Sequence, residues 1–83
     1  MKMKITVKDR EQSGSYYDKD GCLIATMLKR RGVRRFCLGH VTLHTPQGYF
    51  NVNGYEVFRL HYGANGERVK KSAIGKTIEL IPR

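Results

Sequence analysis

Cysteine, acidic side chains and long apolar runs are scarce in this sequence. Its 83 residues hold only two cysteines, Cys22 and Cys37, which form no Cys-x-x-Cys pair and are too few for a metal cage. No segment approaches the roughly 18 consecutive apolar residues of a membrane-spanning helix. The N-terminus alternates apolar with polar residues, unlike a signal peptide. These absences predict no bound metal, no membrane association and two reduced, mostly buried thiols in the cytoplasm.

The shortage of acidic side chains leaves a strongly basic chain. Sixteen Lys and Arg residues face seven Asp and Glu residues, so the formal net charge is +9. Such an excess favours polyanionic partners, namely nucleic acid, an acidic protein surface or a phosphorylated small molecule. The alternative is a soluble basic domain that has no polyanionic partner.

The length predicts a single domain over 1–83, with a small core. Its clearest element is an amphipathic helix over about 20–31, whose apolar stripe consists of Leu23, Ile24, Met27 and Leu28. Asp18 or Asp20 can accept hydrogen bonds from the first N–H groups of this helix. Gly32 can adopt the left-handed conformation that ends a helix. Both ends of the segment therefore carry helix signals.

Alternation of apolar with polar residues predicts antiparallel strands elsewhere in the chain. The strand segments are 2–8, 33–44, 49–52 and 76–81. In the second segment the apolar residues change parity, and a bulge at Gly39-His40 would return them to one face. The turn Thr45-Pro-Gln-Gly48 joins this strand to the next as a hairpin. Residues 9–20, rich in Ser, Gly and charge, predict a long loop.

The segment after the hairpin carries two conflicting signals. Its alternation from Tyr55 onward allows a strand, whereas Asn53 lies three residues before Glu56, close to a capping box. We favour a short second helix over about 54–62, ended by Gly63. The predicted fold is therefore α+β, a small antiparallel sheet of three to four strands with the main helix packed on one face and the short second helix.

Three segments together form a pattern found in other proteins. They are Ile5-Thr-Val7, a Gly-containing loop, and Cys22-Leu-Ile-Ala25-Thr-Met-Leu28. The pattern resembles small uncharacterised phage and bacterial proteins with an I-T-V strand followed by a C-P-[VI]-A-x-A-[LI] helix, although Leu23 replaces the Pro. Phe58, Gly63 and the strand around Leu80 resemble their closing segment. The resemblance implies the order strand–helix–hairpin–helix–strand and a phage-like origin, hence the host cell cytoplasm. It implies no activity.

Catalytic chemistry finds little support in the sequence. His40 and His44 would lie about 13 Å apart along one strand, too far for one metal ion. Cys37 and His40 could pair as nucleophile and base, but in a strand they would point to opposite faces unless the bulge reorients them, and a structural role for Cys37 is favoured. The glycines form no phosphate-binding loop. We therefore expect no enzymatic activity and no cofactor.

Two basic clusters are the candidate sites. The first runs from the helix end into the hairpin and consists of Lys29, Arg30, Arg31, Arg34 and Arg35. The second consists of Arg68, Lys70 and Lys71. Arginine suits phosphate because its guanidinium donates hydrogen bonds in a planar fork. Tyr16 and Tyr17 are candidates for stacking on bases. A solvated turn that only caps the helix is the alternative.

These observations favour a small basic phage-type accessory protein. It would dock on nucleic acid or a nucleoprotein complex through the arginine-rich turn between the helix and the hairpin. One alternative is a protein–protein inhibitor of a host or defence factor that has an acidic surface. Another is an oligomeric sponge for a phosphorylated signal nucleotide.

Overall fold

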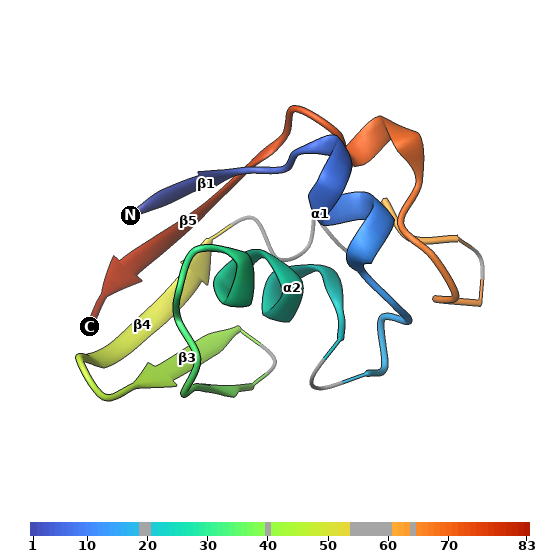
Figure 1. Ribbon diagram of the computed structural model, residues 1–83. Helices are drawn as coiled ribbons and strands as arrows, with labels where there is room; N and C mark the ends of the chain where they lie inside the picture. Colours follow the sequence, from blue (N-terminus) through green and yellow to red (C-terminus); the bar gives the residue numbers. More distant parts are fainter. Residues whose placement is uncertain (19–20, 40, 54–60, 64) are drawn as a thin grey trace.

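The computed structural model places a five-stranded antiparallel sheet at the centre of the fold (Figure 1). It describes residues 1–18, 21–39, 41–53, 61–63 and 65–83. The strands are β1 (Lys2–Lys4), β2 (Cys37–Leu38), β3 (Thr42–Thr45), β4 (Gly48–Asn53) and β5 (Thr77–Pro82). They lie in the order β1-β5-β4-β3-β2. The predicted α+β class is confirmed, with more strands than the three to four expected.

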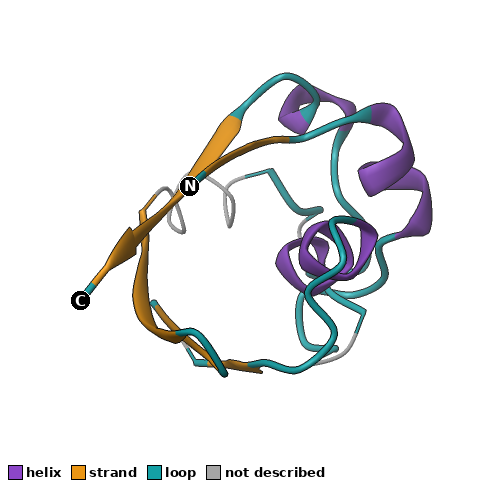
Figure 2. Ribbon diagram, turned by 60° about the vertical axis from the view of Figure 1, so that its left-hand side comes forward, coloured by secondary structure: helices purple, strands orange, loops and turns teal. Residues whose placement is uncertain are grey.

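Helix α2 (Leu23–Arg30) lies across the concave face of the sheet (Figures 1 and 2). Its inward side chains are fully buried, namely Leu23, Ile24, Met27 and Leu28. They share one core with alternate residues of the sheet, namely Met3, Leu43, Val52, Ile78 and Leu80. Burial therefore confirms the predicted apolar stripe of the helix and the predicted alternation of the closing strand.

Gly32 ends α2 as the sequence predicts. Its φ angle is 87°, in the left-handed region that favours glycine. The N–H of Gly32 donates to the Lys29 carbonyl at 3.1 Å, and the N–H of Val33 donates to the Leu28 carbonyl at 3.0 Å. This pair of bonds is the Schellman arrangement. It fixes the direction in which the arginine-rich turn leaves the helix.

The beginning of α2 differs from the prediction. Its N-cap residue is Cys22, whose side chain makes no cap hydrogen bond. Instead, the Tyr62 hydroxyl accepts a hydrogen bond from the N–H of Leu23 at 2.9 Å. The prediction of Asp18 as the N-cap residue is therefore wrong, because Cys22 holds that position and the hydroxyl of a tyrosine distant in sequence accepts from the first N–H of the helix. Asp20 lies outside the described residues.

A second helix, α1 (Val7–Gln12), replaces the end of the predicted strand and the start of the predicted loop. The N–H of Asp9 donates to the Thr6 hydroxyl at 3.1 Å, and the N–H of Thr6 donates to the Asp9 carboxylate at 2.9 Å. This capping box starts the helix. Because Val7 continues the apolar alternation, it suggested a strand, but its side chain is exposed.

The predicted single strand over 33–44 is a hairpin of two strands. Leu38 in β2 pairs with Leu43 in β3, and the N–H of Gly39 donates to the Thr42 carbonyl at 2.8 Å. The bulge prediction is therefore wrong. The apolar residues change parity because β2 and β3 are separate antiparallel strands. Leu38 of the first parity lies on β2, and Leu43 of the second parity lies opposite it on β3. His40, on which the bulge also depended, lies outside the described residues.

The next hairpin confirms the turn prediction. Thr45 pairs with Gly48 across the two turn residues, and β3 pairs with β4 over its whole length. The predicted second helix over about 54–62 falls mostly on residues 54–60, which lie outside the described residues. Further on, Tyr62 forms an isolated antiparallel bridge with Val69. A short 3₁₀ turn, η1 (Lys71–Ala73), then leads into β5.

Candidate functional site

Asp9 holds two arginines of the first basic cluster in place. Its side chain is fully buried, and its carboxylate lies 2.6 Å from the Arg30 guanidinium and 3.2 Å from that of Arg31. Arg31 also donates to the Lys4 carbonyl at 3.0 Å and to the Met27 carbonyl at 2.9 Å. This network joins α1, the end of α2 and β1. The two guanidiniums are therefore engaged in contacts that stabilise the fold, which leaves them less able to bind a ligand.

The same contacts set the charge of Asp9. Burial by itself would raise the pKa of this carboxyl, but hydrogen bonds from Arg31, the Thr6 N–H and Arg30 outweigh it. They lower the pKa to about 2 from the ordinary 3.8. Asp9 is therefore an anion at neutral pH and neutralises part of the cluster.

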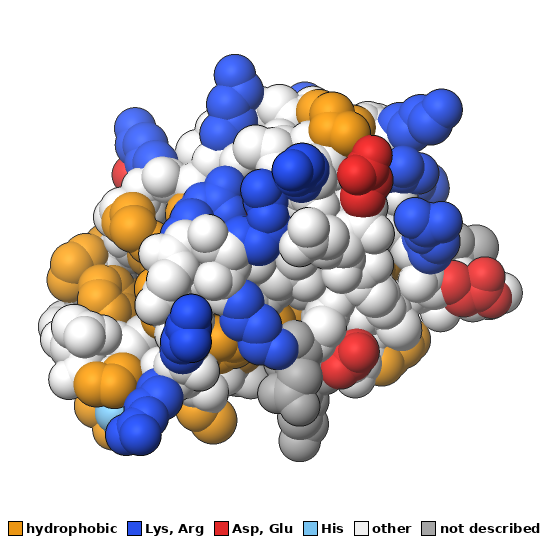
Figure 3. All heavy atoms as spheres, viewed as in Figure 1, with side chains coloured by type: hydrophobic (Ala, Val, Ile, Leu, Met, Phe, Trp, Pro, Cys, Tyr) orange, Lys and Arg blue, Asp and Glu red, His pale blue; other side chains and the backbone are white. Residues whose placement is uncertain are grey.

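The remaining cations of the cluster form what we call the basic edge, Lys29, Arg34 and Arg35. All three are exposed. Arg34 and Arg35 make no ion pair or hydrogen bond with any residue that the structure describes, unlike Arg30 and Arg31. The face seen in Figure 3 shows many Lys and Arg side chains, while most of its visible Asp and Glu side chains lie toward the right. Arg34 and Arg35 are thus the part of the basic edge whose charge is available to a partner.

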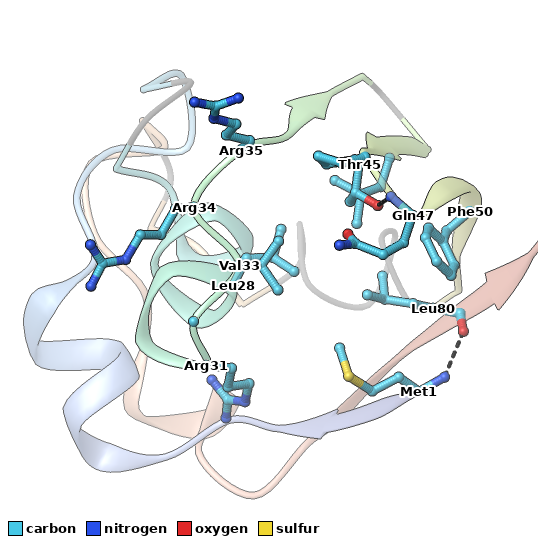
Figure 4. A pocket seen from close by; sticks show the side chains of 13 residues that line it. Met1, Leu28, Arg31, Val33, Arg34, Arg35, Thr45, Gln47, Phe50 and Leu80 are labelled. Atoms are coloured by element: carbon cyan, nitrogen blue, oxygen red, sulfur yellow. Dashed lines mark hydrogen bonds between the residues drawn. The ribbon is translucent and has the colours of Figure 1, made fainter.

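A pocket of about 550 Å³ opens beside the basic edge (Figure 4). One side of the pocket is formed by the end of α2 and the turn that follows it, and the other side by the β3–β4 hairpin. We call it the α2–hairpin pocket. Its apolar lining consists of Met1, Leu28, Val33, Leu43, Phe50 and Leu80. The polar side chains of Thr45 and Gln47 complete the hairpin side. This volume falls in the range of about 300–1,000 Å³ of small-molecule sites.

The charged groups around the pocket point away from it or are held by Asp9, whereas apolar and uncharged polar side chains line its interior. Val33 points into the cavity, and Gln47 extends its amide across it from the hairpin turn (Figure 4). The guanidiniums of Arg34 and Arg35 point away from the cavity, beside its mouth on the α2 side. The guanidinium of Arg31, which also lines the pocket, is held by Asp9. A ligand that fits this arrangement has an uncharged body and outlying anionic groups.

A second, smaller hollow of about 290 Å³ shares Arg35 with the basic edge. Its lining includes Cys37 and His44, which face each other across β2 and β3. The His44 ring stacks on Tyr49 with 4.1 Å between ring centres and 10° between planes. The prediction that Cys37 is buried is wrong, because β2 is the edge strand and leaves its thiol exposed.

The second basic cluster lies elsewhere on the molecule. Arg68, Lys70 and Lys71 are exposed around η1 and line neither hollow. Tyr16 and Tyr17 lie with them, because the N–H of Tyr16 donates to the Gly66 carbonyl at 2.7 Å. Figure 1 shows this part of the chain at the end of the molecule opposite the β3–β4 hairpin. The structure therefore divides the predicted site into two separate regions.

The two tyrosines differ in what they offer. Tyr16 is half-buried and packs edge-on against the buried Tyr62, with 5.4 Å between ring centres. Tyr17 is 76% exposed and meets the edge of Tyr16 at 5.3 Å. Tyr17 is therefore open to a stacking partner, whereas Tyr16 belongs largely to the core.

The most useful pocket residues escaped the sequence reasoning. Gln47 lies within the predicted turn and Phe50 in the predicted strand that follows it, and this placement is the one signal that pointed toward them. Across the described part of the chain, no three His, Cys, Asp or Glu side chains gather in a way that could hold a metal ion. Among the helices of that part, none is long and apolar enough to cross a membrane. No family model, curated protein or solved structure matches the chain.

Proposed function

We propose that this protein binds nucleic acid through the basic edge, as an accessory protein that acts on nucleic acid or on a nucleoprotein complex. The observation that carries the proposal is the state of Arg34 and Arg35. Both are exposed, neither has a partner within the described residues, and both lie beside an open pocket. Uncompensated cations next to a concave surface suit a polyanion, whose phosphates release counterions on binding.

The fold supports the proposal by fixing where these arginines lie. The Schellman bonds at Gly32 and the Asp9 network with Arg30 and Arg31 anchor one end of the turn. The pairing of β2 with β3 anchors the other end. Because both ends are fixed, the backbone that carries Arg34 and Arg35 loses little further freedom on binding, and the cost that remains is the ordering of the two side chains. The excess of positive charge also speeds encounter with any polyanion.

The test is binding across a salt series. Arg34→Gln combined with Arg35→Gln removes two cations without touching the core, so the fold should persist. Each phosphate contact contributes about 0.7 to the slope of log affinity against log salt for single strands, so the slope should fall by about 1.4. The matched control is Lys70→Gln combined with Lys71→Gln, which makes the same charge change at the other region. This control should leave the slope nearly unchanged.

The outcomes separate the hypotheses. If the wild-type protein binds neither DNA nor RNA in low salt, the nucleic-acid proposal is wrong. In that case, stoichiometric capture of one acidic protein would favour the inhibitor hypothesis. A rise in melting temperature with a phosphorylated nucleotide would favour the sponge hypothesis. If both double variants weaken binding equally, the protein binds polyanions through its whole charge and the basic edge is not a site.

A further inference from the structure

We propose that the α2–hairpin pocket accepts one unstacked nucleobase of a single strand, while the neighbouring phosphates lie on Arg34 and Arg35. This inference rests on the proposed function and specifies its ligand. It makes the protein a reader of single strands, since in a duplex the bases are stacked inside and cannot enter a pocket without being flipped out.

The lining of the pocket favours a flat and largely uncharged body. Met1 and Val33 present accessible aliphatic surface over the buried Leu28 and Leu80, and Phe50 adds an aromatic ring on the hairpin side. A charged group placed on this lining would lose its water without gaining a partner. A base has a π-face that stacks on an aromatic ring whatever its identity. The pocket therefore suits the base of a nucleotide better than its phosphate.

Gln47 supplies the polar contact that a base edge needs. Its amide extends into the cavity and makes no hydrogen bond with the residues that the structure describes (Figure 4). The neighbouring Thr45 hydroxyl is already engaged, because it accepts from the Gln47 N–H at 3.1 Å. A glutamine amide offers both a donor and an acceptor, as the exposed edge of an unpaired base requires. Gln47 is therefore the side chain that would read the base.

The placement of charge argues for a strand. The guanidiniums of Arg34 and Arg35 point away from the cavity, beside its mouth, so anions are attracted along the rim (Figure 4). Arg31 lines the cavity, but its guanidinium is bound to Asp9 and to two backbone carbonyls. One uncharged body inside and anionic groups on the rim match a base and its flanking backbone phosphates.

The decisive comparison uses two strands of equal charge. One is a short single-stranded oligonucleotide with bases, and the other is a strand of the same length in which every site is abasic. The wild-type protein should bind the strand with bases roughly tenfold more tightly, since stacking and edge contacts are lost with the bases. The abasic strand should keep the salt dependence that Arg34 and Arg35 provide. A duplex of the same length should gain nothing from its bases, so its binding should show only the electrostatic, salt-dependent part.

Val33→Phe tests the pocket directly. The larger side chain narrows the cavity and leaves the charge unchanged, so the preference for bases should fall severalfold while the salt slope is preserved. Val41→Phe adds the same bulk at an exposed valine outside the pocket and should keep the preference. If Val33→Phe does not fold in a thermal melt, Gln47→Ala and Phe50→Leu replace it. Each of these should reduce the preference severalfold.

Each result bears on a different proposal. Equal wild-type binding of the strands with and without bases would overturn base insertion and leave the proposed function standing. A folded Val33→Phe protein that keeps the full preference would also overturn base insertion. If a nucleoside monophosphate displaces the strand as well as the strand displaces itself, the pocket holds a free nucleotide, and the strand proposal is wrong. Binding of neither strand at low salt would overturn the proposed function itself.

Discussion

The Asp9 carboxylate and the Arg30 guanidinium lie 2.6 Å apart, although 21 residues separate them in the chain. This contact ties α1 to the last turn of α2, and Arg31 reinforces it at 3.2 Å. The carboxylate is fully buried, and the two arginine side chains are only 29% and 28% exposed. Removing one partner of such a group leaves charge without compensation, which is costly. The stability of this corner therefore depends on the ionised state of one carboxyl group.

Asp9 should make folding stability depend on acid. Because the pKa of Asp9 is about 2 in the folded protein and 3.8 ordinarily, its contribution is fully present above about pH 4. It is lost as the pH falls toward 2 and amounts to about 2 kcal/mol. Asp9→Asn should lower the free energy of unfolding at pH 6 by at least this amount and flatten its decline below pH 4. Urea denaturation at a series of pH values measures both effects.

Glu11→Gln is the control for Asp9→Asn, because it removes a carboxylate from the exposed side of the same helix. It should change the free energy of unfolding by less than about 0.5 kcal/mol. An Asp9→Asn protein with the wild-type pH profile would show that the carboxylate is not held by the two arginines.

Leu28→Ala should destabilise the protein by about 2–5 kcal/mol, because this fully buried side chain joins the helix to the sheet. Val7→Ala, at an exposed apolar position of α1, should cost little. Denaturant melts of both variants provide the measurement. A loss below about 0.5 kcal/mol for Leu28→Ala would mean that α2 does not pack as described.

Tyr62→Phe should cost about 1–3 kcal/mol, because it leaves the buried N–H of Leu23 without its acceptor. The hydroxyl also donates to the Gly14 carbonyl at 3.2 Å, so it joins the loop before α2 to the helix. Burial raises the pKa of Tyr62, and the hydroxyl therefore keeps its proton for this bond. Tyr17→Phe is the matched control at an exposed tyrosine. Equal melting temperatures for the two variants would contradict the capping role.

The two cysteines should react at very different rates. Cys37 is exposed on the edge strand, whereas Cys22 is buried and burial raises the pKa of its thiol. A thiol reagent should therefore label one site rapidly in the native protein and two sites after unfolding. Cys37→Ser should abolish the rapid phase. Rapid labelling that survives this substitution would place Cys22 at the surface.

Local signals explain which elements could be predicted from the sequence. Gly32 ends α2, and the Pro46-Gln47 turn closes the β3–β4 hairpin, because both depend on backbone preferences of neighbouring residues. The start of α1 was missed because Val7 continued an apolar alternation. The Thr6–Asp9 capping box outweighed that alternation. Where two local signals conflicted, hydrogen bonds at the helix start decided the outcome.

The residues of the candidate site are defined by contacts between side chains that are distant in sequence, and such contacts cannot be predicted from local patterns. Arg30 and Arg34 belong to the same arginine-rich segment, and the sequence does not distinguish their roles. The contact of Arg30 with the buried Asp9 shows that Arg30 supports the fold, whereas Arg34 makes no such contact within the described residues. The pocket likewise joins Val33 to Phe50 and Leu80, which meet only when the sheet has formed. No local pattern predicts a cavity between such distant residues.

The place of β5 in the sheet constrains how the molecule can assemble. This strand runs between β1 and β4, so among the strands that the structure describes β1 pairs only with β5. Until β5 has been synthesised, β1 therefore lacks this partner, and the hairpins of β2, β3 and β4 keep an open edge. Pairing of such distant segments is slow because a long loop must close first. Leu80 of β5 lines the α2–hairpin pocket. The pocket should therefore be among the last features to form as the nascent chain folds.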